Sequence, residues 1–375
     1  MAEWERKGPL HLWLQQVFKH KKQFGSKDRK FYRDAIYALF RLGDWGSKLN
    51  TETRMALGLW RQFPERTEFQ DYLKSSGIVQ GNLLSFEDYC RDVKEPYEPY
   101  QNFESYLQPE AEMSELNEWF GSVAPVWIGA NPSRLAELSD FLLKKGIEAR
   151  KDRGAFELQA GSQLNEAVEK GLCRIQDLSS RLSIDEHLHP GAELIWDACC
   201  GAGGKSLRLC EAYPNATLYI SDSRPAIVNN AENRFRLLGY PAPFSAVCNL
   251  NKKVSEMVFA NGAIIKKAVF DMVVCDVPCS GSGTWRRTPE NLSEFNTKQI
   301  EEYARLQRKI VGNSLPFLKP GGTLVYITCS VFSAENRVNA EIIAAENGLK
   351  LKESGVIGGL KLNADYLYRA VLKKP

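Results

Sequence analysis

The sequence predicts an α/β protein whose C-terminal half is a doubly wound parallel sheet. In front of it we expect a helical domain and a small α+β module. Three observations support this. Strand and helix patterns alternate after His189-Pro190-Gly191, apolar residues recur at helical spacing over the first 90 residues, and the pattern between them is mixed. Hydrophobic residues make up 43% of the chain and charged residues 25%, enough to bury sizeable cores.

The N-terminal segment, residues 1–93, reads as a helical domain. His11–Lys19 and Arg29–Leu42 place apolar residues at three- and four-residue steps, and Ser26 or Asp28 is a suitable cap for the second helix. Residues 94–115 are rich in Pro, Tyr and Glu and predict an acidic linker. Residues 1–50 contain eleven Lys or Arg and five Asp or Glu, which indicates either an RNA-facing surface or a solvated helix face.

Residues 116–185 predict the small α+β module. Val126–Ala130 has the pattern of a strand, and Ser133–Lys145 that of an amphipathic helix. Short strands are expected at 147–150, 156–159 and 173–176. Such a module either presents its sheet to RNA or acts as a spacer.

Residues 186–375 predict the doubly wound domain. Helices are expected at Ser223–Leu238 and Lys298–Leu318, between strands at 194–198, 217–221, 245–248, 271–276, 323–328 and 367–372. Ligands of such sheets bind outside the carboxyl ends of the strands. Functional residues should therefore follow the strands directly.

The first strand of this domain runs into the glycine-rich segment Asp197–Ser206. Cys199 stands where a P-loop needs glycine, and Ser206 where a dinucleotide fingerprint needs it, so both motifs fail. Asp222 at the end of the second strand is placed either to accept hydrogen bonds from ribose hydroxyls or to cap the next helix. Asn249, after the third strand, is placed to meet an adenine.

Two cysteines follow the fourth and fifth strands, in Asp276-Val-Pro-Cys279-Ser and Thr-Cys329-Ser. Neighbouring parallel strands would bring both thiols to one edge beside the glycine loop. A thiolate that adds to carbon 6 of cytosine makes carbon 5 nucleophilic, and a carboxyl group such as Asp276 can share a proton with the ring. Either cysteine alone reads as a buried structural residue; the pair points to a reacting site, without assigning the roles.

Other residues support this reading or limit it. Arg286 and Arg287 are candidates to hold RNA phosphates, and Trp285 either stacks on a base or lies in the core. The nine cysteines include no Cys-x-x-Cys pair, so we expect neither a disulfide framework nor a metal site. The charged residues 1–7 contain no apolar signal region, so we expect a cytoplasmic protein with no membrane association.

Residues from about 120 to 375 resemble the RsmB/Sun-type RNA (cytosine-5) methyltransferases. The resemblance lies in DACCGAGGKS, DMVVCDVPCSGSGTWRRTP, LKPGGTLVYITCSVFSAEN and LYRAVLKK. It implies a Rossmann-like domain that uses S-adenosyl-L-methionine. It also implies that Cys329 is the nucleophile, that Cys279 helps to release product and that Asp276 contacts both cofactor and base. The implied cofactor-binding residues are Cys199, Cys200, Gly201, Ala202, Gly203, Gly204, Lys205, Asp222, Asn249 and Asp276.

The segment GSKDRKFYRDAIYALFRLG is similar to the NusB-like RNA-binding domain of bacterial 16S rRNA enzymes, which favours 16S rRNA as the partner. We expect the protein to be a monomer. The chain departs from the family pattern within Cys200-Gly201-Ala202, at Asn249, at Gly129 and at Tyr366-Leu-Tyr368. Three alternatives remain. They are a methyltransferase acting on tRNA or another RNA, a methyltransferase acting on a small molecule or protein, and a non-catalytic RNA-binding assembly factor.

Overall fold

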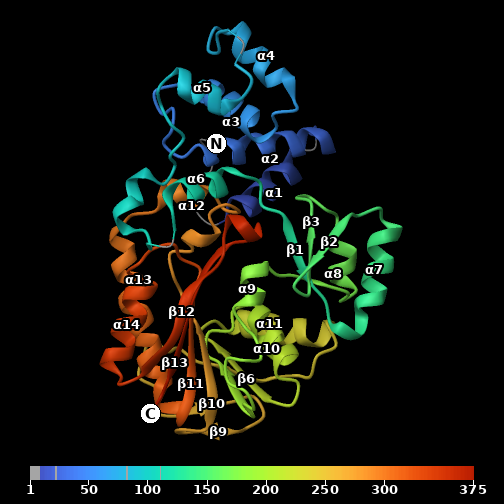
Figure 1. Cartoon of the computed structure of the whole chain (residues 1–375). Helices are drawn as coiled ribbons and strands as arrows, with labels where there is room; N and C mark the ends of the chain where they lie inside the picture. The colour runs from blue at the N-terminus through green and yellow to red at the C-terminus, as the bar shows by residue number, and fades with distance from the viewer. Residues whose placement is uncertain (1–8, 22, 82, 110) are drawn as a thin grey trace. The chain divides into compact units, whose positions relative to one another are not determined.

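The computed structural model describes residues 9–21, 23–81, 83–109 and 111–375 (Figure 1). The described residues form two compact units. The helical unit contains residues up to 105 together with 112–123 and 285–295, and the sheet unit contains 106–111, 124–284 and 296–375. Three segments of the helical unit, 94–105, 112–123 and 285–295, therefore lie outside the predicted domain 1–93. The boundaries at residues 93, 115 and 185 stay a prediction.

The helical unit confirms the two helices predicted from spacing. They are α1 (Leu10–His20) and α2 (Ser26–Arg41), and the unit also contains α3 (Thr51–Gln62), α4 (Thr67–Ser75), α5 (Phe86–Asp92), α6 (Met113–Gly121) and α12 (Glu290–Glu294). Asp28 supports the start of α2, because its carboxylate accepts a hydrogen bond from the N–H of Gly25 at 2.9 Å. Trp60 and Phe86 are buried in the core that α2, α3, α4 and α5 share.

The small module is a four-stranded antiparallel sheet in the order β2-β3-β1-β4. Its strands are β1 (Val126–Gly129), β2 (Ala149–Asp152), β3 (Ala155–Leu158) and β4 (Arg174–Ile175), and its helices are α7 (Leu135–Lys144) and α8 (Asn165–Glu169). The four strands and the helix expected here are therefore present. The short helix α9 (Leu178–Leu182) leads from the module into the main sheet.

The main sheet has seven strands in the order β12-β13-β11-β10-β5-β6-β7. Their bounds are β5 (Leu194–Asp197), β6 (Thr217–Asp222), β7 (Phe244–Val247), β10 (Phe270–Asp276), β11 (Leu318–Thr328), β12 (Lys350–Gly358) and β13 (Tyr366–Lys373). The five strands from β11 to the edge strand β7 run parallel, and β13 and β12 extend the other side of the sheet through antiparallel pairing. The chain order reverses between β5 and β10, which is where such sheets bind ligands.

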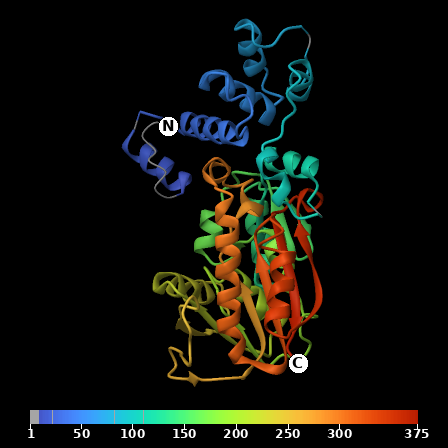
Figure 2. The same ribbon diagram turned by 90° about the vertical axis from the view of Figure 1, so that its left-hand side faces the viewer.

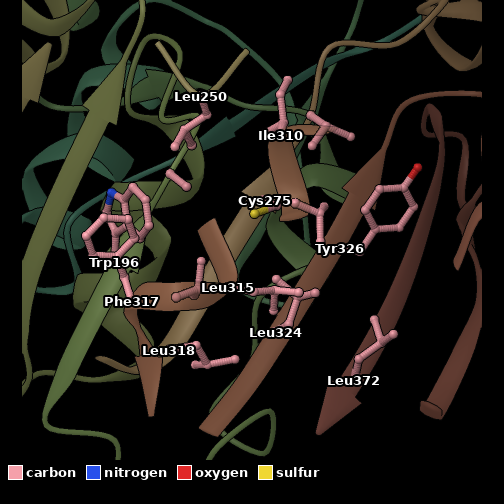
Figure 3. Packing of buried hydrophobic residues seen from close by; sticks show 14 of the residues in the cluster. Trp196, Leu250, Cys275, Ile310, Leu315, Phe317, Leu318, Leu324, Tyr326 and Leu372 are labelled. Carbon is pink, nitrogen blue, oxygen red and sulfur yellow. The ribbon is translucent and has the colours of Figure 1, made fainter. Parts of the chain in front are cut away.

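Helices cover both faces of the main sheet, as the doubly wound prediction requires. Figure 1 shows α10 (Gly204–Ala212) and α11 (Pro225–Leu237) on one side, and α13 (Lys298–Ser314) and α14 (Arg337–Glu346) on the other. Figure 2 shows the second pair lying along the strands. Adjacent residues of one strand enter different cores: Trp196 packs with Cys275 and Phe317 (Figure 3), whereas Ile195 packs on the α10–α11 side. Because these strands are buried on both faces of the sheet, their sequences are almost continuously apolar.

Three features differ from the expected elements or add to them. Leu318 begins β11 instead of ending the preceding helix, because α13 stops at Ser314 and a short 3₁₀ turn follows. Strand β12 and the hairpin β8 (Met257–Val258) with β9 (Ile264–Ile265) were not predicted.

Among the helices of the described residues, none combines the length and the hydropathy needed to cross a lipid bilayer.

Candidate active site at the carboxyl edge of the main sheet

The glycine-rich loop connects β5 directly to α10. Gly201 and Gly203 adopt left-handed φ values of 52° and 81°. A Cβ on Gly203 would lie 3.2 Å from the Cβ of Ala231 on α11, so this position also needs a residue without a side chain. A Cβ on Gly201 would meet no atom within 4 Å, so the backbone there faces open space. Helix α10 begins at Gly204 and turns the free N–H groups of its first turn toward this loop.

Asp222 is the last residue of β6, and its side chain contacts the glycine-rich loop. Its Oδ2 accepts a hydrogen bond from the N–H of Gly201 at 3.2 Å, and its Oδ1 accepts one from Nε of Arg224 at 2.9 Å. Burial raises the pKa of Asp222, but the Arg224 contacts outweigh it, so the pKa is lowered and the carboxylate stays charged. The N-cap of α11 is Arg224, so Asp222 does not occupy the cap position that we considered.

Asn249 follows β7 and is exposed. Its Oδ1 accepts a hydrogen bond from the N–H of Asn251 at 3.0 Å, which stabilises the local turn. The contact with adenine that we expect of this side chain stays a prediction.

A partly buried ion pair connects the glycine loop to β10. Nζ of Lys205 donates to Oδ2 of Asp276 at 2.7 Å, and the Lys205 side chain is 11% exposed. Burial lowers the pKa of Lys205, but the Asp276 carboxylate outweighs it, and a thiolate at Cys329 is among the charges that raise this pKa further. The ammonium group therefore lies within electrostatic reach of both a carboxylate and a site thiol.

Asp197, the last residue of β5, was not among the predicted site residues. Its side chain is fully buried, and its Oδ2 accepts a hydrogen bond from Oγ of Ser206 at 2.6 Å. Burial raises the Asp197 pKa to about 7; the Ser206 contact opposes this, and the charge of Asp276 adds to it. The sequence did contain a signal for Asp197 as a site residue, because it stands at the end of a strand, at the start of the glycine-rich segment.

The two thiols lie side by side, as the strand order predicted. Sγ of Cys279 is 3.1 Å from Sγ of Cys329, and the N–H of Cys329 points to Sγ of Cys279 at 3.3 Å. This proximity follows from the sheet, since Asp276 at the end of β10 pairs in register with Ile327 of β11. The two cysteines come three and two residues later.

The contact between the thiols changes the acidity of Cys279. Its pKa is raised well above that of a free thiol, first by the hydrogen bond with Cys329 and then by burial and by the negative charges of Cys329 and Glu335. Cys279 therefore holds its proton while a thiolate occupies Cys329.

The segment after the Gly-Ser-Gly turn belongs to the helical unit. Trp285 is fully buried and stacks on Tyr100, which places it in the core. Arg286 is 3% exposed, and its Nη2 donates to the carbonyl of Val123 at 2.8 Å. This burial runs against the predicted phosphate contact of Arg286, because its guanidinium already binds backbone carbonyls. Arg287 is exposed, and its RNA contact stays a prediction.

Gly129 is one of the positions where the chain departs from the family pattern. It is the last residue of β1, and two arginine side chains lie close to it. A Cβ at Gly129 would lie 3.4 Å from the guanidinium carbon of Arg174 and 3.5 Å from Nη1 of Arg181. Both arginines pair with Glu211 of α10 at 2.7 Å. The positive charge near this position therefore comes from β4 and α9.

Comparison with known proteins agrees with this architecture. Residues 187–370 match the family model described as 16S rRNA methyltransferase RsmB/F. The ribosomal RNA small subunit methyltransferase B of Proteus mirabilis (strain HI4320) is 28% identical over 69% of this chain and 63% of its own length. The enzyme of the same name from Klebsiella pneumoniae (strain 342) is 31% identical over 69% of this chain and 62% of its own. The chain thus spans less than two thirds of the length of these relatives.

Two solved structures share the fold. The protein named PH0851 superposes with a TM-score of 0.72 at 18% identity, over 96% of this chain and 93% of its own. NSun6 from Pyrococcus horikoshii, solved with SFG, gives a TM-score of 0.59 at 15% identity, over 74% of this chain and 98% of its own. Residues 187–370 are thus similar to the 16S rRNA methyltransferases RsmB/F, and the curated relatives extend this similarity to 69% of the chain.

Proposed function

We propose that this protein is an S-adenosyl-L-methionine-dependent RNA methyltransferase that methylates carbon 5 of a cytidine through a covalent cysteine adduct. One observation carries the proposal. Two thiols, with sulfurs 3.1 Å apart, follow two adjacent parallel strands at the edge where the Lys205–Asp276 ion pair and the glycine loop also lie. A methyltransferase that only transfers a methyl group to an oxygen or nitrogen has no chemical need for paired thiols.

The residues of the loop fit S-adenosyl-L-methionine. The open backbone at Gly201 and the N–H groups at the start of α10 suit its carboxylate, and the charged Asp222 suits ribose hydroxyls. We assign the binding surface to residues 199–205 with Asp222, Asn249 and Asp276. When bound, the cofactor supplies an electrophilic methyl group.

Cys329 acts first in the proposed reaction. Its thiolate adds to carbon 6 of the cytosine, forming a C–S bond and moving the electrons of the 5,6 double bond toward carbon 5 and the ring. Asp276 is the group that we assign to sharing a proton with ring nitrogen 3 as negative charge develops. Lys205, bonded to Asp276 at 2.7 Å, orients that carboxylate and keeps a positive charge beside the ring.

Cys279 acts second, and the geometry supplies a reason for the delay. While Cys329 is a thiolate, the hydrogen bond between the sulfurs keeps the Cys279 pKa high. Once the Cys329 sulfur is bonded to carbon 6 it is a neutral thioether, so this effect disappears and Cys279 ionises more easily. Carbon 5 bonds to the methyl group, and the Cys279 thiolate, whose own proton has passed to solvent, then takes the proton from carbon 5. The electrons of that bond re-form the ring double bond as the C–S bond breaks and returns the thiolate to Cys329.

For the substrate we propose 16S rRNA, and we keep the predictions of a monomer and of cytoplasmic location. The names of the curated relatives support the substrate class. The exposed Arg287, in the same segment as the buried Arg286, is the arginine that we retain as an RNA contact. Bisulfite sequencing of total RNA from cells with and without the gene identifies the cytidine and separates 16S rRNA from tRNA.

The decisive experiment uses three single cysteine variants with 16S rRNA and the labelled cofactor. Cys329→Ala should abolish methylation, and Cys279→Ala should accumulate a protein–RNA adduct that migrates slowly in a denaturing gel. Cys210→Ala, on α10 and outside the thiol pair, serves as the control and should match the wild type. If Cys329→Ala retains turnover, the covalent mechanism is wrong. RNA binding without any cofactor binding would instead favour the assembly factor.

A further inference from the structure

A buried carboxylate, Glu335, joins the two loops that carry the thiols. Its side chain is fully buried between the end of β11 and the start of α14. Oε2 accepts a hydrogen bond from the N–H of Ser280 at 2.9 Å, and Oε1 accepts one from Oγ of Ser330 at 2.8 Å. Ser280 and Ser330 are the residues directly after Cys279 and Cys329. One side chain therefore bonds the neighbour of each thiol.

Helix α13 fixes this carboxylate from a third direction. Nε2 of Gln307 donates to Oε2 of Glu335 at 3.0 Å and to the carbonyl of Pro278 at 3.0 Å. Oε1 of Gln307 accepts from the hydroxyl of Tyr326 at 2.8 Å and from Nδ2 of Asn339 at 2.8 Å. Gln307 therefore cannot rotate without losing bonds to β11 and α14. The carboxylate is held in one place by donors from separate elements.

Packing alone does not explain a charged group at this position. Burying a carboxylate is costly unless donors satisfy it, and an apolar side chain of similar size would fill the space at lower cost. Burial raises the pKa of Glu335, and its contacts with Ser280, Ser330 and Gln307 oppose that rise. A residue that bonds the neighbours of both site thiols has a geometric task at the site.

We propose that Glu335 is a positioning residue that holds the sulfurs of Cys279 and Cys329 at contact distance by bridging Ser280 and Ser330. Its catalytic consequence rests on the proposed function: when the sulfurs separate, attack by Cys329 persists but release through Cys279 slows. The positioning itself requires neither RNA nor cofactor, so it can be tested separately.

The first test uses phenylarsine oxide, which binds tightly only where two thiols are adjacent. In the full-length wild-type chain, one arsenical should bridge Cys279 and Cys329 and protect both from iodoacetamide, as read by peptide mass spectrometry. Cys279→Ala should abolish this protection. Glu335→Asp, which is one methylene too short to reach both loops, should lower arsenical affinity at least tenfold. Glu341→Gln on α14, whose side chain is 55% exposed, is the matched control and should leave the arsenical affinity unchanged.

Circular dichroism and thermal unfolding identify the folded variants. If Glu335→Asp does not fold, Ser330→Ala removes only one of the bridging bonds and should give a smaller loss of arsenical affinity. Wild-type affinity in a folded Glu335→Asp, or in Ser330→Ala where that variant replaces it, overturns the inference.

The second test measures kcat, KM for RNA and the trapped adduct for Glu335→Asp, which keeps the negative charge that raises the Cys279 pKa. We expect a lower kcat, an unchanged KM and more adduct, as in Cys279→Ala. A rise in KM with no adduct would show a general structural role and overturn the catalytic consequence. If Cys279→Ala forms no RNA adduct but Glu335 substitutions still weaken arsenical capture, the proposed function fails while the positioning role stands.

Discussion

Replacing Asp197 by asparagine should change how the stability of the sheet unit depends on pH. The carboxyl group is fully buried, and burial raises its pKa from 3.8 to about 7. The folded chain therefore binds a proton between these pH values that the unfolded chain releases. Its stability is complete below pH 3.8 and falls as the pH rises toward 7. Asparagine keeps the shape and an acceptor for Ser206, but it does not titrate.

The expected magnitude follows from the width of the pH window. Each pH unit well inside this window costs the wild type about 1.4 kcal/mol, and the cost per unit falls as Asp197 titrates near pH 7. Between pH 5 and pH 7 the wild type should therefore lose about 2 kcal/mol that Asp197→Asn retains. Amide hydrogen exchange of peptides from β5, compared between the two proteins at each pH, measures this local free energy of opening. Parallel stability profiles for the two proteins over this range would refute the argument that Asp197 is buried as a neutral acid.

Three further results are expected. Lys205→Met removes the ion pair with Asp276 at 2.7 Å, so kcat in the methylation assay should fall about 100-fold; unchanged turnover would contradict the role of the pair. In Cys329→Ala the largest cause of the raised Cys279 pKa is gone, so the midpoint of Cys279 alkylation should move to lower pH, and an unmoved midpoint would contradict the delayed action of Cys279. A Cβ on Gly283 would lie 1.9 Å from the carbonyl oxygen of Tyr366, so Gly283→Ala should cost about 1–3 kcal/mol in denaturant unfolding, and wild-type stability would show that the turn moves.

Much of the sheet could be predicted because its strands carry strong local signals. The central strands are apolar on both faces, and polar or sulfur-bearing residues follow directly where they end. Adjacency of Cys279 and Cys329 followed from strand order alone, with no knowledge of side-chain geometry. Strand β12 gave no comparable signal, since it is a partly exposed edge with a register shift between Leu351 and Glu353.

The features that the sequence did not predict share one physical cause: the surroundings of these residues are formed by residues distant in the sequence. Arg286 and Arg287 are adjacent in the sequence, and Arg286 is the one whose guanidinium donates to the carbonyls of residues 122 and 123. In the sequence, Glu335 cannot be distinguished from a surface glutamate, because it is buried only through the packing of β10, β11 and α13 around it. Neither contact has a periodic signature, so sequence patterns could not reveal them.

The parallel pairing of β10 with β11 places a strict limit on how this chain can vary. The two sulfurs are in contact because Asp276 is level with Ile327 and because each cysteine follows at a fixed number of residues. One residue of strand advances the chain by about 3.3 Å, which is as long as the gap between the sulfurs themselves. A single insertion or deletion between Asp276 and Cys279, or between Ile327 and Cys329, would therefore move one sulfur out of reach of the other. We expect natural variants to tolerate length changes in the β8–β9 hairpin far more readily than in these two short segments.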